Sequence, residues 1–78
     1  MNNKELLDKL ANTNTCNDQE NIAFENVLKL VGFPNARVTC GITYLVGRGT
    51  IEFPPMDIHN AAKMILKILL KNNIIKEA

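Results

Sequence analysis

The hydrophobic pattern at the start of the chain predicts two helices, over residues 3–11 and 17–31. In both stretches, apolar residues recur every three or four positions and therefore fall on one helix face. These apolar positions are Leu6, Leu7 and Leu10 in the first helix, and Ala23, Phe24, Val27, Leu28, Leu30 and Val31 in the second. Asn17 and Glu20 have the spacing of a capping box at the start of the second helix, and Gly32 is the expected residue after its end.

The period changes to two at residue 36, which predicts one long strand over residues 36–46 with a single buried face. The side chains expected on that face are Ala36, Val38, Cys40, Ile42, Tyr44 and Val46. Residues 50–53 show the same alternation, and the glycine-rich segment 47–49 between them is typical of a turn. The two strands are therefore expected to form an antiparallel β-hairpin.

The register of this hairpin follows from the requirement that paired residues share a face. Pairing Val46 with Ile51, and Tyr44 with Phe53, places these side chains together on the buried side. Such a pairing needs a loop of two or four residues around Arg48.

The last third of the chain is predicted to form a helix over residues 58–72. Asp57 is a suitable cap for its first turn. Pro54 and Pro55 end the preceding strand, because neither can donate a hydrogen bond to a ladder. The two isoleucines at 74–75 either extend the helix or form a tail.

The predicted element order, α-α-β-β-α, describes a small α+β domain with helices packed on one face of the hairpin. The chain has 78 residues, 46% hydrophobic content and a formal net charge of +1, which fits one globular domain over residues 1–78. No apolar run approaches the roughly 18 residues of a membrane span. Two cysteines and no recognisable leader favour a cytoplasmic chain with reduced thiols.

The last predicted helix carries more apolar surface than a surface helix normally does. Its apolar arc is about 240° wide, whereas the usual stripe is only a little wider than 100°. The flanks near Met64 and Leu70 therefore need cover. Either the helix lies deep between the hairpin and the first two helices, or part of this face meets a second copy of the chain.

The predicted long strand also exceeds its short hairpin partner, which leaves backbone groups around Arg37, Thr39 and Gly41 unclaimed. A second subunit could complete the sheet, or a target strand could add to it by β-augmentation. Alternatively, the tail around residues 74–75 returns to form a third strand, or the end of the long strand frays. Both imbalances favour self-association, most simply a two-fold homodimer.

Residues able to carry catalysis or bind a metal are isolated in the sequence. His59 is the only histidine and has no histidine or cysteine four positions away, so we expect an ordinary residue of a first helical turn. Cys40 is expected in the core. Cys16 precedes the start of a helix, a position that can raise the reactivity of a thiol. The sequence separation does not decide whether Cys16 and Cys40 form a disulfide. We therefore expect that the protein is not an enzyme and that it binds no metal ion or cofactor.

Three lysines spaced four apart, Lys63, Lys67 and Lys71, form what we call the lysine ridge. With Arg37 and Arg48 they offer cations that could contact nucleic acid phosphates, although a solvated helix face is the simpler explanation of the three lysines. Arg37 and Arg48 could instead hold a small anionic ligand between subunits.

These observations together favour a non-enzymatic protein-binding module, acting as a regulator, inhibitor or adaptor and as a homo-oligomer. Its interaction surface is expected at the helix flank and the strand edge, at Met64, Leu70, Arg37, Thr39 and Gly41. The alternatives are nucleic acid binding by the lysine ridge and anion binding between subunits.

Overall fold

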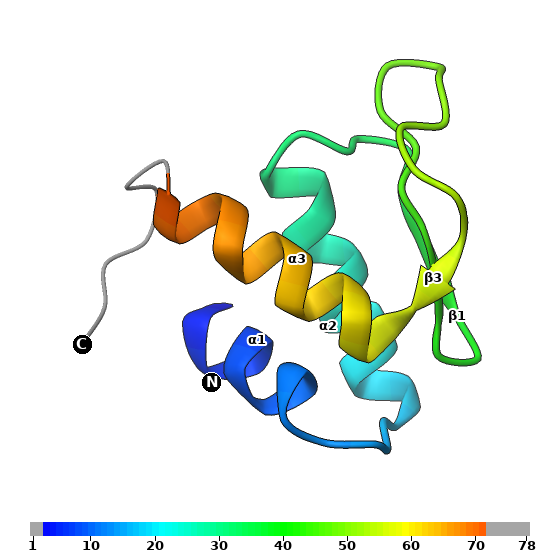
Figure 1. Ribbon diagram of the computed structural model, residues 1–78. Helices are drawn as coiled ribbons and strands as arrows, with labels where there is room; N and C mark the ends of the chain where they lie inside the picture. The colour runs from blue at the N-terminus through cyan, green and yellow to red at the C-terminus, as the bar shows by residue number, and fades with distance from the viewer. Residues whose placement is uncertain (1–2, 72–78) are drawn as a thin grey trace.

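The computed structural model describes residues 3–71 and confirms the predicted mixed α+β fold. Figure 1 shows the helices gathered on one side of a three-stranded antiparallel sheet with strand order β1-β2-β3. The elements are α1 (Asn3–Ala11), α2 (Asp18–Leu30), β1 (Arg37–Thr39), β2 (Ile42–Tyr44), β3 (Met56–Asp57) and α3 (Ile58–Lys71). None of these helices is both long and apolar enough to cross a membrane.

The boundaries of the first two helices follow the local sequence signals. The Asn17 side chain accepts a hydrogen bond from the Glu20 N–H at 2.8 Å, and the Glu20 carboxylate accepts one from the Asn17 N–H at 3.0 Å. The predicted capping box is therefore confirmed. At the other end, Gly32 has a φ of 121°, and Phe33 N–H bonds back to the Leu28 carbonyl at 2.9 Å, as in a Schellman motif.

The prediction of one strand over residues 36–46 was wrong, because the chain reverses within that segment. Cys40 and Gly41 both have positive φ angles, 50° and 77°, and join β1 to β2 as a two-residue hairpin turn. The register pairs Arg37 with Tyr44, Val38 with Thr43, and Thr39 with Ile42. The apolar alternation continues through the turn, so the sequence pattern resembles that of an uninterrupted strand.

This turn inverts the expected burial of the second half of the segment. Paired residues share a face, so Val38 and Thr43 lie together against the helices, and Leu45 follows on the same side. Thr43 and Leu45 are fully buried, whereas Ile42 and Tyr44 are both 38% exposed. The expected inward positions of Cys40, Ile42 and Tyr44 were therefore wrong, and Cys40 is exposed in the turn.

The second hairpin exists, but only as an arm, which we define as residues 45–53. The predicted pair Val46–Ile51 is confirmed as an antiparallel bridge, and Gly47 N–H donates to the Thr50 carbonyl at 2.8 Å across the turn. Ile51 is nevertheless 73% exposed and Phe53 37% exposed, so their expected burial was wrong. The turn of the arm projects past the end of the sheet and away from the helices (Figure 1).

The third strand, β3, was not predicted. It places Met56 opposite Thr43 and Asp57 opposite Ile42. Asp57 also caps α3 as expected, because its Oδ1 atom accepts hydrogen bonds from the N–H groups of His59 at 2.8 Å and Asn60 at 3.2 Å.

Helix α3 packs mainly against α1 and also contacts β2 and β3. Its buried side chains are Ile58, Ala61, Ala62, Ile65 and Leu69. Met64, expected on an uncovered flank, is half-buried against this core. The side chain of Leu70 and the isoleucines at 74–75 lie outside the described residues.

Helix α2 follows its predicted pattern except at its last residue. Phe24, Val27 and Leu28 are buried as expected, but Leu30 is 76% exposed. Leu30 was expected on the buried face, but this last residue of α2 is largely exposed.

Candidate functional site

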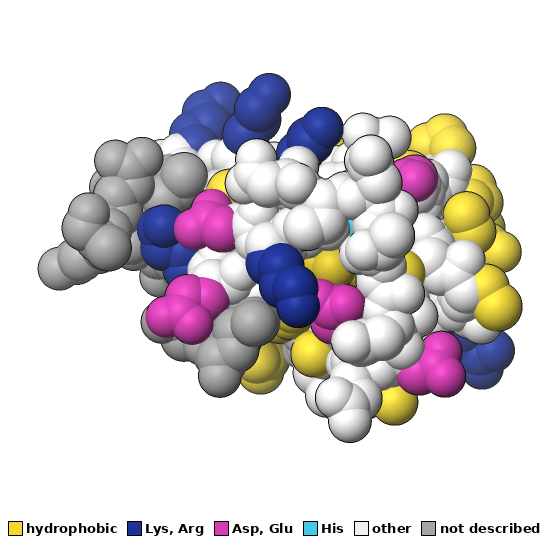
Figure 2. Space-filling model, turned by 90° about the horizontal axis from the view of Figure 1, so that it is seen from below, with side chains coloured by type: hydrophobic (Ala, Val, Ile, Leu, Met, Phe, Trp, Pro, Cys, Tyr) yellow, Lys and Arg dark blue, Asp and Glu magenta, His cyan; other side chains and the backbone are white. Residues whose placement is uncertain are grey.

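The side of the sheet that faces away from the helices carries most of the exposed apolar surface. Ile42 and Tyr44 lie on this side of β2, and Val46 continues their alternation, so its bridge partner Ile51 belongs to the same side. Figure 2 shows hydrophobic side chains gathered on the side of the molecule where Figure 1 places the sheet. We call this surface the outer sheet face. It is defined as Ile42, Tyr44 and Ile51, together with the exposed Phe53, which follows Ile51 by two positions, and with Arg37 and Thr39 along its β1 margin.

The concentration on this face is not a general property of the surface. Six large apolar side chains are exposed among the described residues, and four of them are the members of the outer sheet face. The other two, Ile22 and Leu30, lie on α2. Single exposed apolar residues are ordinary in soluble proteins, whereas a contiguous group marks an interaction surface.

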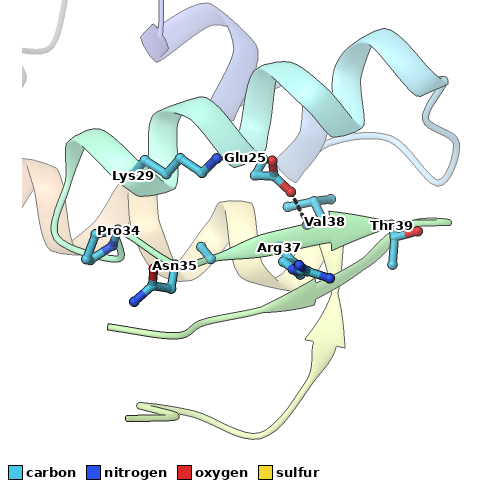
Figure 3. A pocket seen from close by; sticks show the side chains of 8 residues that line it. Glu25, Lys29, Pro34, Asn35, Arg37, Val38 and Thr39 are labelled. Atoms are coloured by element: carbon cyan, nitrogen blue, oxygen red, sulfur yellow. Dashed lines mark hydrogen bonds and ion pairs between the residues drawn. The ribbon is translucent and has the colours of Figure 1, made fainter. Parts of the chain in front are cut away.

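A second candidate surface is the cleft between α2 and β1, shown in Figure 3. This β1–α2 cleft has a volume of about 560 Å³. Glu25 and Lys29 line it from the helix, and Arg37, Val38 and Thr39 line it from the strand. Arg37 and Thr39, predicted as interaction residues, thus lie in this cleft.

The backbone donors near β1 that were expected to be unclaimed have partners within the chain. Val38 N–H donates to the Glu25 carboxylate at 3.0 Å, and Gly41 N–H donates to the Asn21 side chain at 3.3 Å. The Gly41 carbonyl accepts a hydrogen bond from Ile58 N–H at 2.8 Å. The turn at Gly41 is therefore tied to both α2 and α3.

The lysine ridge lies along the exposed side of α3. Within residues 3–71, no ion pair is formed by Lys63, Lys67 or Lys71. The two arginines grouped with them lie elsewhere: Arg37 is on β1, and Arg48 is at the tip of the arm. The five cations are therefore divided among three places: the exposed side of α3, strand β1 and the turn of the arm.

His59 connects two helices. Its Nδ1 atom lies 2.8 Å from the Leu10 carbonyl oxygen, which can only accept a hydrogen bond, so Nδ1 carries the proton. The half-buried ring borders a polar hollow of about 420 Å³, together with Asp57, Asn60 and Lys63. No group of three metal-ligating side chains is formed by the residues that the structure describes.

Both cysteines are free thiols. The half-buried Cys16 Sγ lies 3.8 Å from the Asn21 side-chain oxygen, which also accepts the Gly41 N–H. Cys16 therefore packs beneath the β1–β2 turn, and Cys40 forms the exposed part of that turn.

An ion pair joins α1 to α2. Lys9 Nζ lies 2.9 Å from Glu20 Oε2, and the Glu20 side chain is only 12% exposed. The hydrogen bond from Lys9 lowers the pKa of Glu20 below its ordinary value, as do the Asn17 N–H and the charges of Lys9 and His59; partial burial opposes them.

The outer sheet face was missed at the sequence level, because its members were assigned to the core or to a different register. The available signal was Gly41, since an isolated glycine within a strand pattern often marks a turn or bulge. Comparison with protein-family models, curated proteins and solved structures found no match. The functional argument therefore depends on the surfaces themselves.

Proposed function

We propose that this chain is a non-enzymatic protein-binding module that acts as a homodimer through its outer sheet face. One observation carries the proposal: of the six large apolar side chains that are exposed within residues 3–71, four belong to the outer sheet face, which lies away from helices α1 to α3. Such a module would act as a regulator, inhibitor or adaptor, with further protein partners at its remaining surfaces.

The composition of the face is that of a protein interface. Ile42 and Tyr44 form an uncharged centre, and the charge of Arg37 lies at the margin. An apolar centre with an aromatic residue and a polar rim is typical of protein interfaces, in which tyrosine and arginine are enriched. Each 100 Å² of apolar area removed from water contributes roughly 2.5 kcal/mol before the costs of association.

A second copy is the partner that this face fits best. Around a two-fold axis, the central residues Ile42 and Tyr44 meet their own counterparts without opposing like charges. The core of the described domain is small, so burial of its sheet face adds stability that a larger domain would not need.

The test is the molar mass by size-exclusion chromatography with light scattering at tens of micromolar. The wild-type chain is expected to elute at the mass of two chains, and Ile51→Lys at the mass of one. Leu30→Lys is the matched control, because Leu30 is equally exposed but lies on α2. A monomeric wild type, or equal dissociation by both variants, would refute the homodimer.

Nucleic acid binding by the lysine ridge is the second candidate function. Its support is that the three exposed lysines have no ion-pair partner within residues 3–71. Replacing all three with glutamate should abolish binding to a labelled DNA duplex at low salt. Unchanged binding by this variant, or no binding by the wild type, would exclude the ridge.

We also propose a cytoplasmic location. Cys40 is an exposed free thiol, which a reducing compartment preserves. Fractionation of cells that carry the epitope-tagged chain would test this proposal, and recovery from a secreted fraction would refute it.

A further inference from the structure

The edge of β1 is closed by a side chain in place of a neighbouring strand. In the order β1-β2-β3, β1 is an edge strand, and Val38 N–H points away from β2 to the Glu25 carboxylate at 3.0 Å. A carboxylate oxygen in this position does what the carbonyl oxygen of an added strand would do. Glu25 therefore occupies the place that a pairing segment needs.

From this arrangement we propose that the β1–α2 cleft receives an extended acidic peptide segment, which pairs with β1 and takes the place of Glu25 at Val38 N–H. This proposal concerns a second surface and does not depend on dimerisation through the outer sheet face.

The dimensions of the cleft suit such a segment. Its volume of about 560 Å³ lies alongside the whole of β1, and a peptide strand rises about 3.3 Å per residue. A segment of three to five residues therefore spans roughly 10–16 Å, which is enough to cover the three-residue edge strand β1. The opposite edge is less suitable, because β3 has two residues and follows Pro54 and Pro55, which lack donors.

The charges of the cleft favour an acidic ligand. Glu25 is already paired, since Lys29 Nζ lies 3.4 Å from its Oε2 atom (Figure 3). When the peptide displaces the Glu25 carboxylate from Val38 N–H, Glu25 keeps its ion pair with Lys29. Arg37 is exposed and forms no ion pair within residues 3–71, so its guanidinium is available to a carboxylate on the incoming segment.

The test is a titration of the ¹⁵N-labelled chain with the probe acetyl-Glu-Val-Glu-Val-Glu-amide, followed by amide chemical shifts. We expect saturable shifts at Val38 and Thr39. Two control peptides separate the causes: replacement of the valines by proline removes backbone donors, and replacement of the glutamates by lysine reverses the charge. Both controls should bind at least fivefold more weakly.

Two pairs of variants assign the contacts. Arg37→Ala should weaken binding of the probe at least fivefold, and Arg48→Ala, a second exposed arginine, should not change it. Glu25→Ala should tighten binding about three- to tenfold, because the hydrogen bond between Val38 N–H and Glu25 no longer competes with the peptide. Glu25→Gln keeps an acceptor at this position and should have a smaller effect.

The proposal is overturned if Val38 and Thr39 do not shift at millimolar peptide, or if the proline peptide binds equally well. Shifts centred on the lysine ridge would also overturn it. Repeating the titration with Ile51→Lys, in which the outer sheet face is disrupted, keeps the two proposals separate. Arg37 and Thr39 border both surfaces, so binding to that variant should be as tight as binding to the wild type or tighter, and weaker binding would contradict the separation of the two sites.

Discussion

The Nδ1 atom of His59 lies 2.8 Å from the carbonyl oxygen of Leu10, near the end of α1. This hydrogen bond joins the last turn of α1 to the first turn of α3, two elements that are distant in the sequence and pack closely in the core. The single histidine of the chain thus has a positional role, because it satisfies a carbonyl that the helix end leaves without an intrahelical donor.

Removal of this hydrogen bond should destabilise the fold. His59→Ala is expected to lower the free energy of unfolding by about 1–2 kcal/mol, because the Leu10 carbonyl loses its donor in a half-buried site. The measurement is urea unfolding followed by circular dichroism. Asn60→Ala, at the next and exposed position, is the control and should change the value by less than about 0.5 kcal/mol. Equal effects of the two substitutions would contradict the assigned role.

The ion pair between Lys9 and Glu20 makes stability depend on pH. The pKa of Glu20 is lowered on folding from its ordinary value of 4.5, chiefly by the hydrogen bond from Lys9. Its stabilising contribution is therefore full above that ordinary value and is lost as the pH falls through the lower folded-state pKa. The stability difference between the wild type and Glu20→Gln should be largest near neutral pH and shrink below about pH 4.5.

The pH dependence is measured by urea unfolding of both proteins between pH 3 and 7. Glu5→Gln is the comparison variant, because Glu5 is an exposed acidic residue on α1. A wild-type advantage over Glu20→Gln that stays constant across this range would refute the linkage.

The buried hydroxyl of Thr43 should cost stability. Thr43 is fully buried on the middle strand, and its Oγ1 atom has no hydrogen-bond partner within residues 3–71. Thr43→Val keeps the shape and the strand preference while it removes the polar atom, so we expect a gain of about 0.5–2 kcal/mol in unfolding free energy. Thr39→Val, exposed on the neighbouring strand, should change it by less than about 0.5 kcal/mol. Destabilisation by Thr43→Val would show that the hydroxyl has a partner in solution.

The two-residue turn at Cys40 predicts opposite effects for two substitutions at one site. Cys40 has a φ of 50°, which asparagine tolerates and β-branched residues strongly disfavour. Cys40→Asn creates the Asn-Gly pair typical of type I′ turns and should raise the melting temperature, whereas Cys40→Val should lower it. The unfolding free energies should differ by about 1–2 kcal/mol between the variants. Equal melting temperatures would contradict the turn.

Much of the fold could be predicted from local patterns. The capping residues Asn17, Gly32 and Asp57 were assigned correctly because each acts within one turn of its own backbone. The pairing of Val46 with Ile51 was also predicted, since a tight turn connects them. These features depend on interactions between residues only a few positions apart.

The sequence by itself determined the three helices, the caps of α2 and α3 and the presence of a hairpin, because periodicity and capping are local properties of the chain. Tertiary structure decided where the strand reverses, and with it which side chains face water. An alternation of period two survives a two-residue turn, but pairing across that turn reverses the buried face. Ile42 and Tyr44 therefore lie on the outer sheet face, and only the packing of Val38, Thr43 and Leu45 against the helices determines this.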